Sequence, residues 1–200
     1  MSIDKKALYT LGYGLYVVTA RDEKDNGCIC NTVMQLTDTP LQVAVSLNKT
    51  NYTFEQIRKT GMLNVSVLSE STPFDVFRHF GFQSGRDADK FADFDLWRTE
   101  NGVAALTGEY SNAVLSLKVT ETVDLGSHAL FICEVTEAHT LMERPNMSYA
   151  YYHANVKPKP EAKQSGWVCK ICGYKYEGDP LPEDFICPWC KHPASDFEKI

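Results

Sequence analysis

The chain has 200 residues, of which 44% are hydrophobic and 23% charged, a composition typical of a soluble globular protein with one or two domains. Its formal net charge of −6 argues against general nucleic-acid binding, which needs a basic surface. No run approaches the roughly 18 apolar residues that cross a bilayer, so no membrane association is expected. Because Ala7–Ala20 is too polar and too glycine-rich for a secretory signal, we expect a cytoplasmic protein.

Strand patterns dominate the chain before residue 155. Runs rich in Val, Leu, Ile, Phe and Thr, often alternating with polar residues, predict strands at Leu15–Ala20, Leu41–Leu47, Met62–Leu68, Val114–Val123 and Ala129–Ala138. Shorter helical patterns predict helices at Lys5–Tyr13, Asp75–Phe80 and Asp87–Phe91. Many strands with few helices indicate a mainly β domain built as a barrel or a sandwich.

A further helix is expected from Thr53 to Gly61, with Gln56 completing a capping box at its start. Lys49, Asn51 and Thr53 surround this start, where free N–H groups and the helix dipole favour an anion. A second cluster, Ser84–Arg86 with Lys90, offers a guanidinium suited to bidentate phosphate contact. Each cluster alone also fits an ordinary cap or a solvated charged surface. There is no G-x-G-x-x-G and no Walker loop, which argues against a Rossmann domain.

The segment 155–166, NVKPKPEAKQSG, has the composition of a linker and separates residues 1–154 from residues 167–200. Four of the seven cysteines lie beyond it in two Cys-x-x-Cys pairs, at positions 169, 172, 187 and 190. This spacing predicts that Cys169, Cys172, Cys187 and Cys190 bind a metal rather than form disulfides. Four thiolates in a tetrahedron suit either zinc or iron, and spacing alone does not separate the two.

The residues around these pairs resemble rubredoxin. Cys-x-x-Cys-Gly-Tyr is followed by Cys-Pro-x-Cys, with Trp167, Tyr174, Tyr176, Phe185 and Phe197 as a small aromatic core. The resemblance implies one Fe(Cys)4 centre that transfers single electrons. Lys191 stands where the family usually has glycine, so we expect a strained backbone with φ > 0 there. Trp189, beside a ligand, is either extra core packing or part of an apolar docking patch.

Motifs in the longer domain resemble the flavin reductase-like, FMN-binding split-barrel family. They are Tyr13–Thr19, Asn31–Gln35 leading to Pro40, Ser46–Lys49 with Thr53, and Gly126–Leu130. The tandem order resembles the high-molecular-weight rubredoxins. This resemblance implies a homodimeric, mainly β fold: an FMN-binding split β-barrel with a few helices, plus a small C-terminal rubredoxin domain of the iron-ribbon type.

The resemblance also implies which residues bind FMN. Carried over position by position, the isoalloxazine is bordered by Asn31, Thr32, Val33, Met34 and Gln35. The ribityl chain and phosphate are held by Ser46, Leu47, Asn48, Lys49, Asn51 and Thr53, and the phosphate end is closed by Ser84, Gly85, Arg86 and Lys90. His128 either contacts the flavin or the nicotinamide substrate, or only forms a hydrogen bond at the start of a strand. Ser127 replaces an aspartate that is commoner in the family.

Flavin and an iron thiolate centre together predict an oxidoreductase that converts two-electron into one-electron transfer. Electrons would pass from NAD(P)H to FMN, then to the rubredoxin iron, and then to an external redox partner. The family suggests a flavodiiron protein that reduces oxygen or nitric oxide as that partner. Three alternatives stay open: a non-enzymatic FMN and iron carrier, a zinc-ribbon interaction module on a flavin-binding scaffold, and a reductase that releases free flavin.

Overall fold

The computed structural model describes residues 3–92, 94–158 and 166–200, which fall into two compact units, Met1–Lys157 and Pro158–Ile200. Residues 159–165 of the predicted linker lie outside the described residues, whereas its first two, Asn155 and Val156, end a short helical turn. Within the described ranges, no helix is long and apolar enough to cross a membrane.

The first unit is mainly β. Its elements are η1 (Lys5–Thr10), β1 (Tyr16–Arg21), β2 (Asp25–Cys30), β3 (Val33–Asp38), β4 (Leu41–Asn48), α1 (Tyr52–Thr60), β5 (Met62–Leu68), α2 (Phe74–Gly81), β6 (Leu96–Arg98), β7 (Ala104–Leu106), β8 (Ser111–Asp124), β9 (His128–Thr140), α3 (Tyr149–Tyr151) and η2 (Tyr152–Val156). Seven strands form one antiparallel sheet in the order β2-β1-β5-β8-β9-β4-β3.

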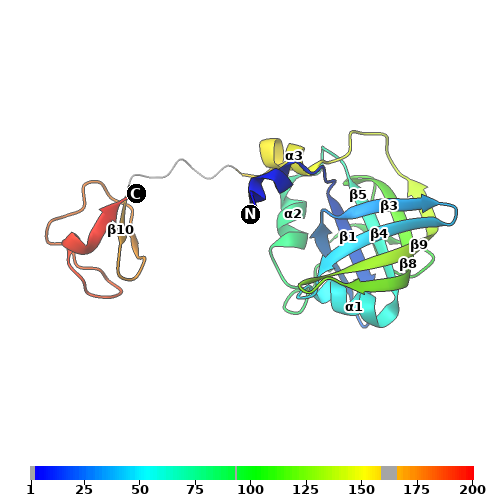
Figure 1. Cartoon of the computed structure of the whole chain (residues 1–200), viewed down its shortest axis with the longest axis horizontal. Coiled ribbons are helices and arrows are strands. Elements are labelled where there is room, and N and C mark those ends of the chain that lie inside the picture. Colours follow the sequence, from blue (N-terminus) through cyan, green and yellow to red (C-terminus); the bar gives the residue numbers. More distant parts are fainter. Residues whose placement is uncertain (1–2, 93, 159–165) are drawn as a thin grey trace. The chain divides into compact units, whose positions relative to one another are not determined.

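This sheet curves around an apolar core, as the split β-barrel prediction requires (Figure 1). Alternation along the strands turns Val18, Val65 and Leu117 inward, and each is fully buried. Helix α1 covers one end of the barrel (Figure 1), where Phe54 and Ile57 pack into the same core. Because its apolar residues recur at helical spacing, α1 buries one face and leaves its N-terminus at the barrel rim.

Helix α2 builds a second apolar cluster on the other side of strands β1 and β2. Val76, Phe77 and Phe80 are buried in it. The ring of Phe77 packs on Tyr152 of the last helical turn, with 4.5 Å between ring centroids. The loop that follows α2, from Phe82 onward, lines a cavity together with Ile29 of strand β2.

All five predicted strands are present, as β1, β4, β5, β8 and β9, and the helix predicted at Asp75–Phe80 is α2. The helix predicted at Asp87–Phe91 is wrong. The backbone turns there because Asp87 N–H and Ala88 N–H both bond to Ser84 O. The Asp89 carboxylate then accepts from Phe91 N–H at 2.9 Å, so a local side-chain bond replaces the helical one.

The second unit contains the three-stranded sheet β11-β10-β12, with β10 at Trp167–Cys169, β11 at Lys175–Tyr176 and β12 at Phe197–Lys199. A short turn, η3 (Ala194–Asp196), precedes β12. Phe185 is central to its small core and contacts the rings of Tyr174, Tyr176 and Phe197. The aromatic core expected from the sequence is therefore present.

Candidate functional site

A cavity of about 340 Å³ lies where strand β2, the start of α1 and the loop after α2 meet. This volume is within the range of roughly 300–1,000 Å³ that small-molecule pockets occupy. The residues that line it come from three distant segments: Asn26, Cys28 and Ile29; Thr50, Asn51, Tyr52 and Thr53; and Phe80, Gly81, Phe82, Gln83, Ser84, Gly85 and Lys90.

The start of helix α1 faces this cavity without a side-chain cap. Asn51 is the N-cap residue, and its side chain accepts no hydrogen bond from the first turn. The capping box predicted between Thr53 and Gln56 does not form, because Gln56 donates instead to Lys24 O at 2.7 Å. Among the first N–H groups of α1, Phe54 N–H bonds to Asn51 O at 3.1 Å, whereas those of Tyr52 and Thr53 come too early in the helix to have a partner within it. The positive end of α1 is therefore free to bind an anion.

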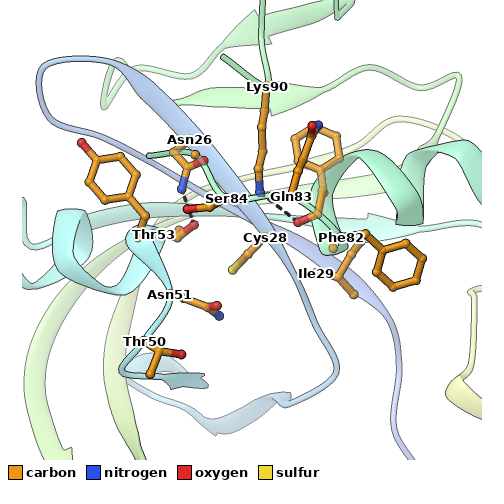
Figure 2. Close-up of a pocket in the computed structure, with 14 residues that line it drawn as sticks. Asn26, Cys28, Ile29, Thr50, Asn51, Thr53, Phe82, Gln83, Ser84 and Lys90 are labelled. Atoms are coloured by element: carbon orange, nitrogen blue, oxygen red, sulfur yellow. Dashed lines mark hydrogen bonds between the residues drawn. The ribbon is translucent and has the colours of Figure 1, made fainter. Parts of the chain in front are cut away.

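Buried polar side chains form one wall of the cavity (Figure 2). Asn26 Nδ2 donates to Thr53 Oγ1 at 2.8 Å. Asn26 is only 2% exposed, yet its Oδ1 has no partner. Burial raises the pKa of Cys28, so it is a neutral thiol at ordinary pH. An unpaired buried acceptor in a cavity wall fits a ligand that brings a hydroxyl donor.

Lys90 extends toward the centre of the same group of residues (Figure 2). Its Nζ donates to Gly27 O at 2.8 Å and to Phe80 O at 3.1 Å, and the residue is 3% exposed. Desolvation lowers the pKa of Lys90, an effect that nearby Cys28 partly opposes. An ammonium has three donors, so one is left for an anion in the cavity. Gly85 is required beside it, because a Cβ there would overlap the Asn26 side chain.

The structure brings together five of the predicted flavin-binding residues in this cavity, namely Asn51, Thr53, Ser84, Gly85 and Lys90. The two other basic residues are engaged elsewhere. Arg86 pairs with Glu55 at 2.5 Å and lies over the Tyr52 ring. Lys49 pairs with Asp124 at 2.5 Å.

A second cavity, of about 580 Å³ and mostly apolar, is lined by four more of the predicted residues, Asn31, Thr32, Val33 and Met34. Gln35 follows them on strand β3, and Ser46, Leu47 and Asn48 lie on the neighbouring strand β4. His128 lies opposite Asn48 at the β4–β9 edge, and its Nδ1 is 2.9 Å from Ser127 Oγ. It lines neither cavity.

Sequence reasoning missed the contribution of strand β2 and of the α2 end, that is Asn26, Cys28, Ile29 and Phe80–Gln83. Asn26 precedes a glycine and Cys28 resembles a small apolar filler, so neither indicated a site. The feature that marks the site is the hydrogen bond between Asn26 and Thr53. Because the chain separates these residues by 27 positions, the bond is visible only in the structure.

The second unit contains a cluster of four cysteines. The Sγ atoms of Cys169, Cys172, Cys187 and Cys190 all lie within 4.8 Å of one another. Two of the S···S distances are 3.6 Å (Cys169–Cys190) and 3.5 Å (Cys172–Cys187). A tetrahedron with metal–sulfur bonds of about 2.3 Å has edges of about 3.8 Å. The donor set therefore fits one tetrahedral S4 metal ion.

Two matching loops, here called knuckles, carry these ligands: residues 169–174 and 187–192. In each knuckle the first cysteine donates its N–H to the carbonyl five residues on, at 2.8 Å. The residue four positions on donates back to that cysteine at 2.8 Å from Gly173 and at 2.9 Å from Lys191. Their φ angles are 78° and 63°, so the expectation of a left-handed lysine is confirmed.

Backbone donors also face the sulfurs. Desolvation raises the pKa of Cys190 to about 12, whereas at Cys187 the N–H groups of Cys190 and Trp189, together with the Cys190 and Cys172 side chains, outweigh desolvation and lower the pKa to about 6. Metal binding requires thiolates, and these backbone donors favour that form at Cys187.

Comparison with known proteins assigns both units. The family model "Flavin reductase like domain" matches residues 8–159, and the model "Rubrerythrin, rubredoxin-like domain" matches residues 167–198. The high molecular weight rubredoxin of Moorella thermoacetica is 37% identical over 99% of this chain and 100% of that protein. The chain belongs to the high-molecular-weight rubredoxin family.

A further relative and a solved structure are also similar to this chain. The ferric-chelate reductase (NAD(P)H) of Archaeoglobus fulgidus is 37% identical over a match covering 78% of this chain and 93% of that protein. The NADH:FAD oxidoreductase SgcE6 of Streptomyces globisporus has the same fold, with a TM-score of 0.65 and 22% identity, over 74% of this chain and 92% of that one.

This high-molecular-weight rubredoxin is therefore an NAD(P)H-dependent oxidoreductase with a flavin and one iron as its cofactors. The described residues fit both groups. The open helix start, Lys90 and the unpaired Asn26 acceptor suit a phosphorylated, hydroxyl-bearing ligand. The four sulfurs suit iron.

Proposed function

We propose that this protein takes electrons from NAD(P)H, holds FMN in the β2–α1–α2 cavity, and delivers single electrons through the Fe(Cys)4 centre to an external acceptor protein. The observation that carries the proposal is a cavity with an uncapped helix start and a buried lysine in the same chain as a four-thiolate centre. When bound, FMN accepts a hydride, whereas an iron thiolate centre changes by one electron at a time. The pairing of the two groups suits conversion of two-electron into one-electron transfer.

The protein side chains supply binding and orientation. The start of α1, with Thr50 and Thr53, and the Lys90 ammonium would neutralise the phosphate. Asn26 Oδ1 would accept from a hydroxyl of the ribityl chain. Asn31–Gln35 would border the isoalloxazine at the neighbouring cavity, and His128 is the weakest candidate for contact with the nicotinamide because it lines neither cavity.

The test is an anaerobic titration with NADH and with NADPH, followed by visible absorption, on protein whose metal has been measured. We expect bleaching of flavin and then of ferric-thiolate absorption, with one iron per chain. A chain that carries both cofactors but is bleached only when a reduced protein is added would instead be a carrier without direct NAD(P)H oxidation. Zinc in place of iron in native preparations would contradict the electron-transfer role.

We also propose that the acceptor is a flavodiiron protein that reduces oxygen or nitric oxide, as the family resemblance suggests. The four thiolates need a reducing compartment, which supports a cytoplasmic location. Oxygen or nitric oxide consumption in a mixture of NADH, this protein and a flavodiiron protein tests the partner. Consumption that is no faster than without this protein would reject it.

Finally, we propose a homodimer that forms through strand β3. This strand lies at one edge of the seven-stranded sheet, and Met34 and Leu36 on it are 61% and 40% exposed. Exposed apolar edge strands promote pairing with another chain. Light scattering should give twice the chain mass, and Leu36→Lys should shift it toward the monomer.

A further inference from the structure

The rubredoxin-like domain exposes apolar side chains beside its ligands. Trp189 and Ile171, the residues between the cysteines of the two knuckles, are 70% and 57% exposed. The alternative that Trp189 is extra core packing is therefore wrong. Its ring rests edge-on against Tyr174 of the other knuckle, with 5.4 Å between ring centroids. Because the ring is already supported, a partner that covers it would lose little side-chain entropy.

Within the two knuckles the charged residues are both lysines, although Asp196 lies next to one of them, because its carbonyl accepts from Lys170 N–H at 2.8 Å. Lys170 and Lys191 are the charged residues of the two knuckles, both are exposed, and neither pairs with a carboxylate within residues 166–200. The domain's carboxylates lie outside the knuckles, at Glu177, Asp179, Glu183, Asp184, Asp196 and Glu198. A chain with a net charge of −6 thus presents lysines next to its metal ligands.

Lys191 holds its charge there at a structural cost. It is the non-glycine residue with positive φ, at 63°, among those described, and Gly173 takes the same place in the other knuckle. A left-handed backbone costs an L-residue about 1–2 kcal/mol, which glycine avoids. Retained strain of this kind points to a function, and the property that lysine adds over glycine is a positive charge.

We propose that Trp189 and Ile171, flanked by Lys170 and Lys191, form a docking surface for an acidic redox protein. The partner would present its cofactor edge in an apolar patch rimmed by aspartate and glutamate. The positive charges of Lys170 and Lys191 favour a partner with an acidic rim, because a basic rim would be repelled. The inference rests on the proposed electron exchange by the iron centre, but not on NAD(P)H oxidation or FMN binding.

The test starts from full-length protein reduced with dithionite and freed of excess reductant. Dithionite leaves one electron on the iron and two on any bound FMN, so the rate is taken from the first step, in which one electron passes from ferrous iron to ferric haem and no atoms are exchanged. The probes are cytochrome b5, with carboxylates around its haem edge, and cytochrome c, with lysines around it. We expect the rate constant for cytochrome b5 to fall as ionic strength rises, and Lys170→Glu to lower it at least tenfold at low salt.

Lys175→Glu is the matched control, because it makes the same charge change outside the knuckles and should change the rate less than twofold. Trp189→Ala should slow cytochrome b5 reduction at least tenfold but leave ferricyanide reduction within twofold, since a small anion needs no apolar contact. As a second readout, the indole N–H signal of Trp189 in the zinc-loaded full chain should shift when cytochrome b5 is added.

Three results would overturn the docking surface. They are faster reaction with cytochrome c at low salt, equal effects of Lys170→Glu and Lys175→Glu, and a cytochrome b5 rate unaffected by Trp189→Ala. None of them depends on NADH, so the proposed NAD(P)H oxidation could still hold. A failed NADH titration would likewise leave this surface intact.

Discussion

Lys191 is the residue whose replacement separates strain from charge. In Lys191→Gly the left-handed backbone becomes favourable, but a freer unfolded chain offsets part of the gain. We expect a net stabilisation of about 0.5–1 kcal/mol, measured by denaturant unfolding of the metal-loaded protein. Removing the positive charge should also lower the reduction potential of the iron, because the reduced site is more anionic.

Lys191→Asn tests the electrostatic part, since asparagine tolerates the left-handed region without a charge. It should lower the potential as Lys191→Gly does, whereas Lys191→Arg should leave it unchanged. Identical potentials in all three variants would reject the electrostatic effect and leave only the strain.

Lys90 predicts a pH dependence of stability. Its pKa in the folded chain is lowered by desolvation, so between that value and its ordinary pKa of 10.5 the unfolded chain binds more protons. The contribution of Lys90 to the free energy of unfolding should therefore rise with pH across this window in the flavin-free protein, whereas the buried thiols of Cys28, Cys30 and Cys133, whose pKa values are raised, contribute a fall above their ordinary pKa of 9.0. The difference between wild type and Lys90→Met, measured by urea unfolding at several pH values, isolates the Lys90 contribution. A bound phosphate would stabilise the ammonium, so FMN should reduce the Lys90 contribution to the pH dependence of wild-type stability. The same slope of stability against pH in flavin-free wild type, FMN-bound wild type and Lys90→Met would contradict a role of Lys90 in phosphate binding.

At the residue scale, the sequence predicts what local motifs control. The positive φ of Lys191 follows from the knuckle pattern alone. The partners of Lys49 and Arg86 do not, because Asp124 and Glu55 lie 75 and 31 positions away in the chain. Whether a basic side chain faces a ligand or a carboxylate depends on which distant segments the fold brings together.

Helix α1 offers a test in which stability and binding change in opposite directions. Asn51→Asp places a negative charge at an N-cap that makes no side-chain hydrogen bond. It should stabilise the flavin-free protein by about 0.3–1 kcal/mol through the helix dipole. The same charge should repel phosphate and weaken FMN binding at least tenfold, measured by flavin fluorescence. Asn51→Ser, a neutral cap, is the control; equal FMN affinity in the two variants would place the phosphate elsewhere.

Elements that pack against a core were predictable, and those that build the cavity were less so. Strand β5 shows its apolar face as alternation in the sequence, but its polar residues Asn64 and Ser66 are buried as well, which the alternation does not predict. Strand β2 contains Asn26, Gly27 and two cysteines, and β3 is almost wholly exposed, so neither has a strand pattern. The predicted capping box is absent for a related reason. The Gln56 side chain donates to the carbonyl of Lys24, 32 positions away, and a local sequence pattern cannot predict so distant a partner.

At the scale of the whole molecule, the two units should differ in what stabilises them. Three residues, Cys169, Cys187 and Phe197, form the buried core of the rubredoxin-like domain, and two of them are metal ligands. So small a core cannot support folding without the metal. Removing the iron should unfold residues 166–200 and leave the barrel's thermal transition unchanged, as seen by amide NMR signals from each unit. Retention of the C-terminal amide dispersion in metal-free protein would contradict this.

Replacing iron with zinc tests whether the metal lies on the electron path, because zinc keeps the tetrahedral S4 site but has no redox chemistry. With zinc at Cys169, Cys172, Cys187 and Cys190, NADH should still bleach the flavin at the iron protein's rate, since the barrel is unaltered. Reduction of cytochrome b5 by NADH should nevertheless fall to the level given by free reduced flavin. In the iron protein, the rate of iron bleaching should not change on dilution, because both groups belong to one chain. Cytochrome reduction at equal rates in both metal forms would mean that electrons leave directly from the flavin, and the four cysteines would then have only a structural role.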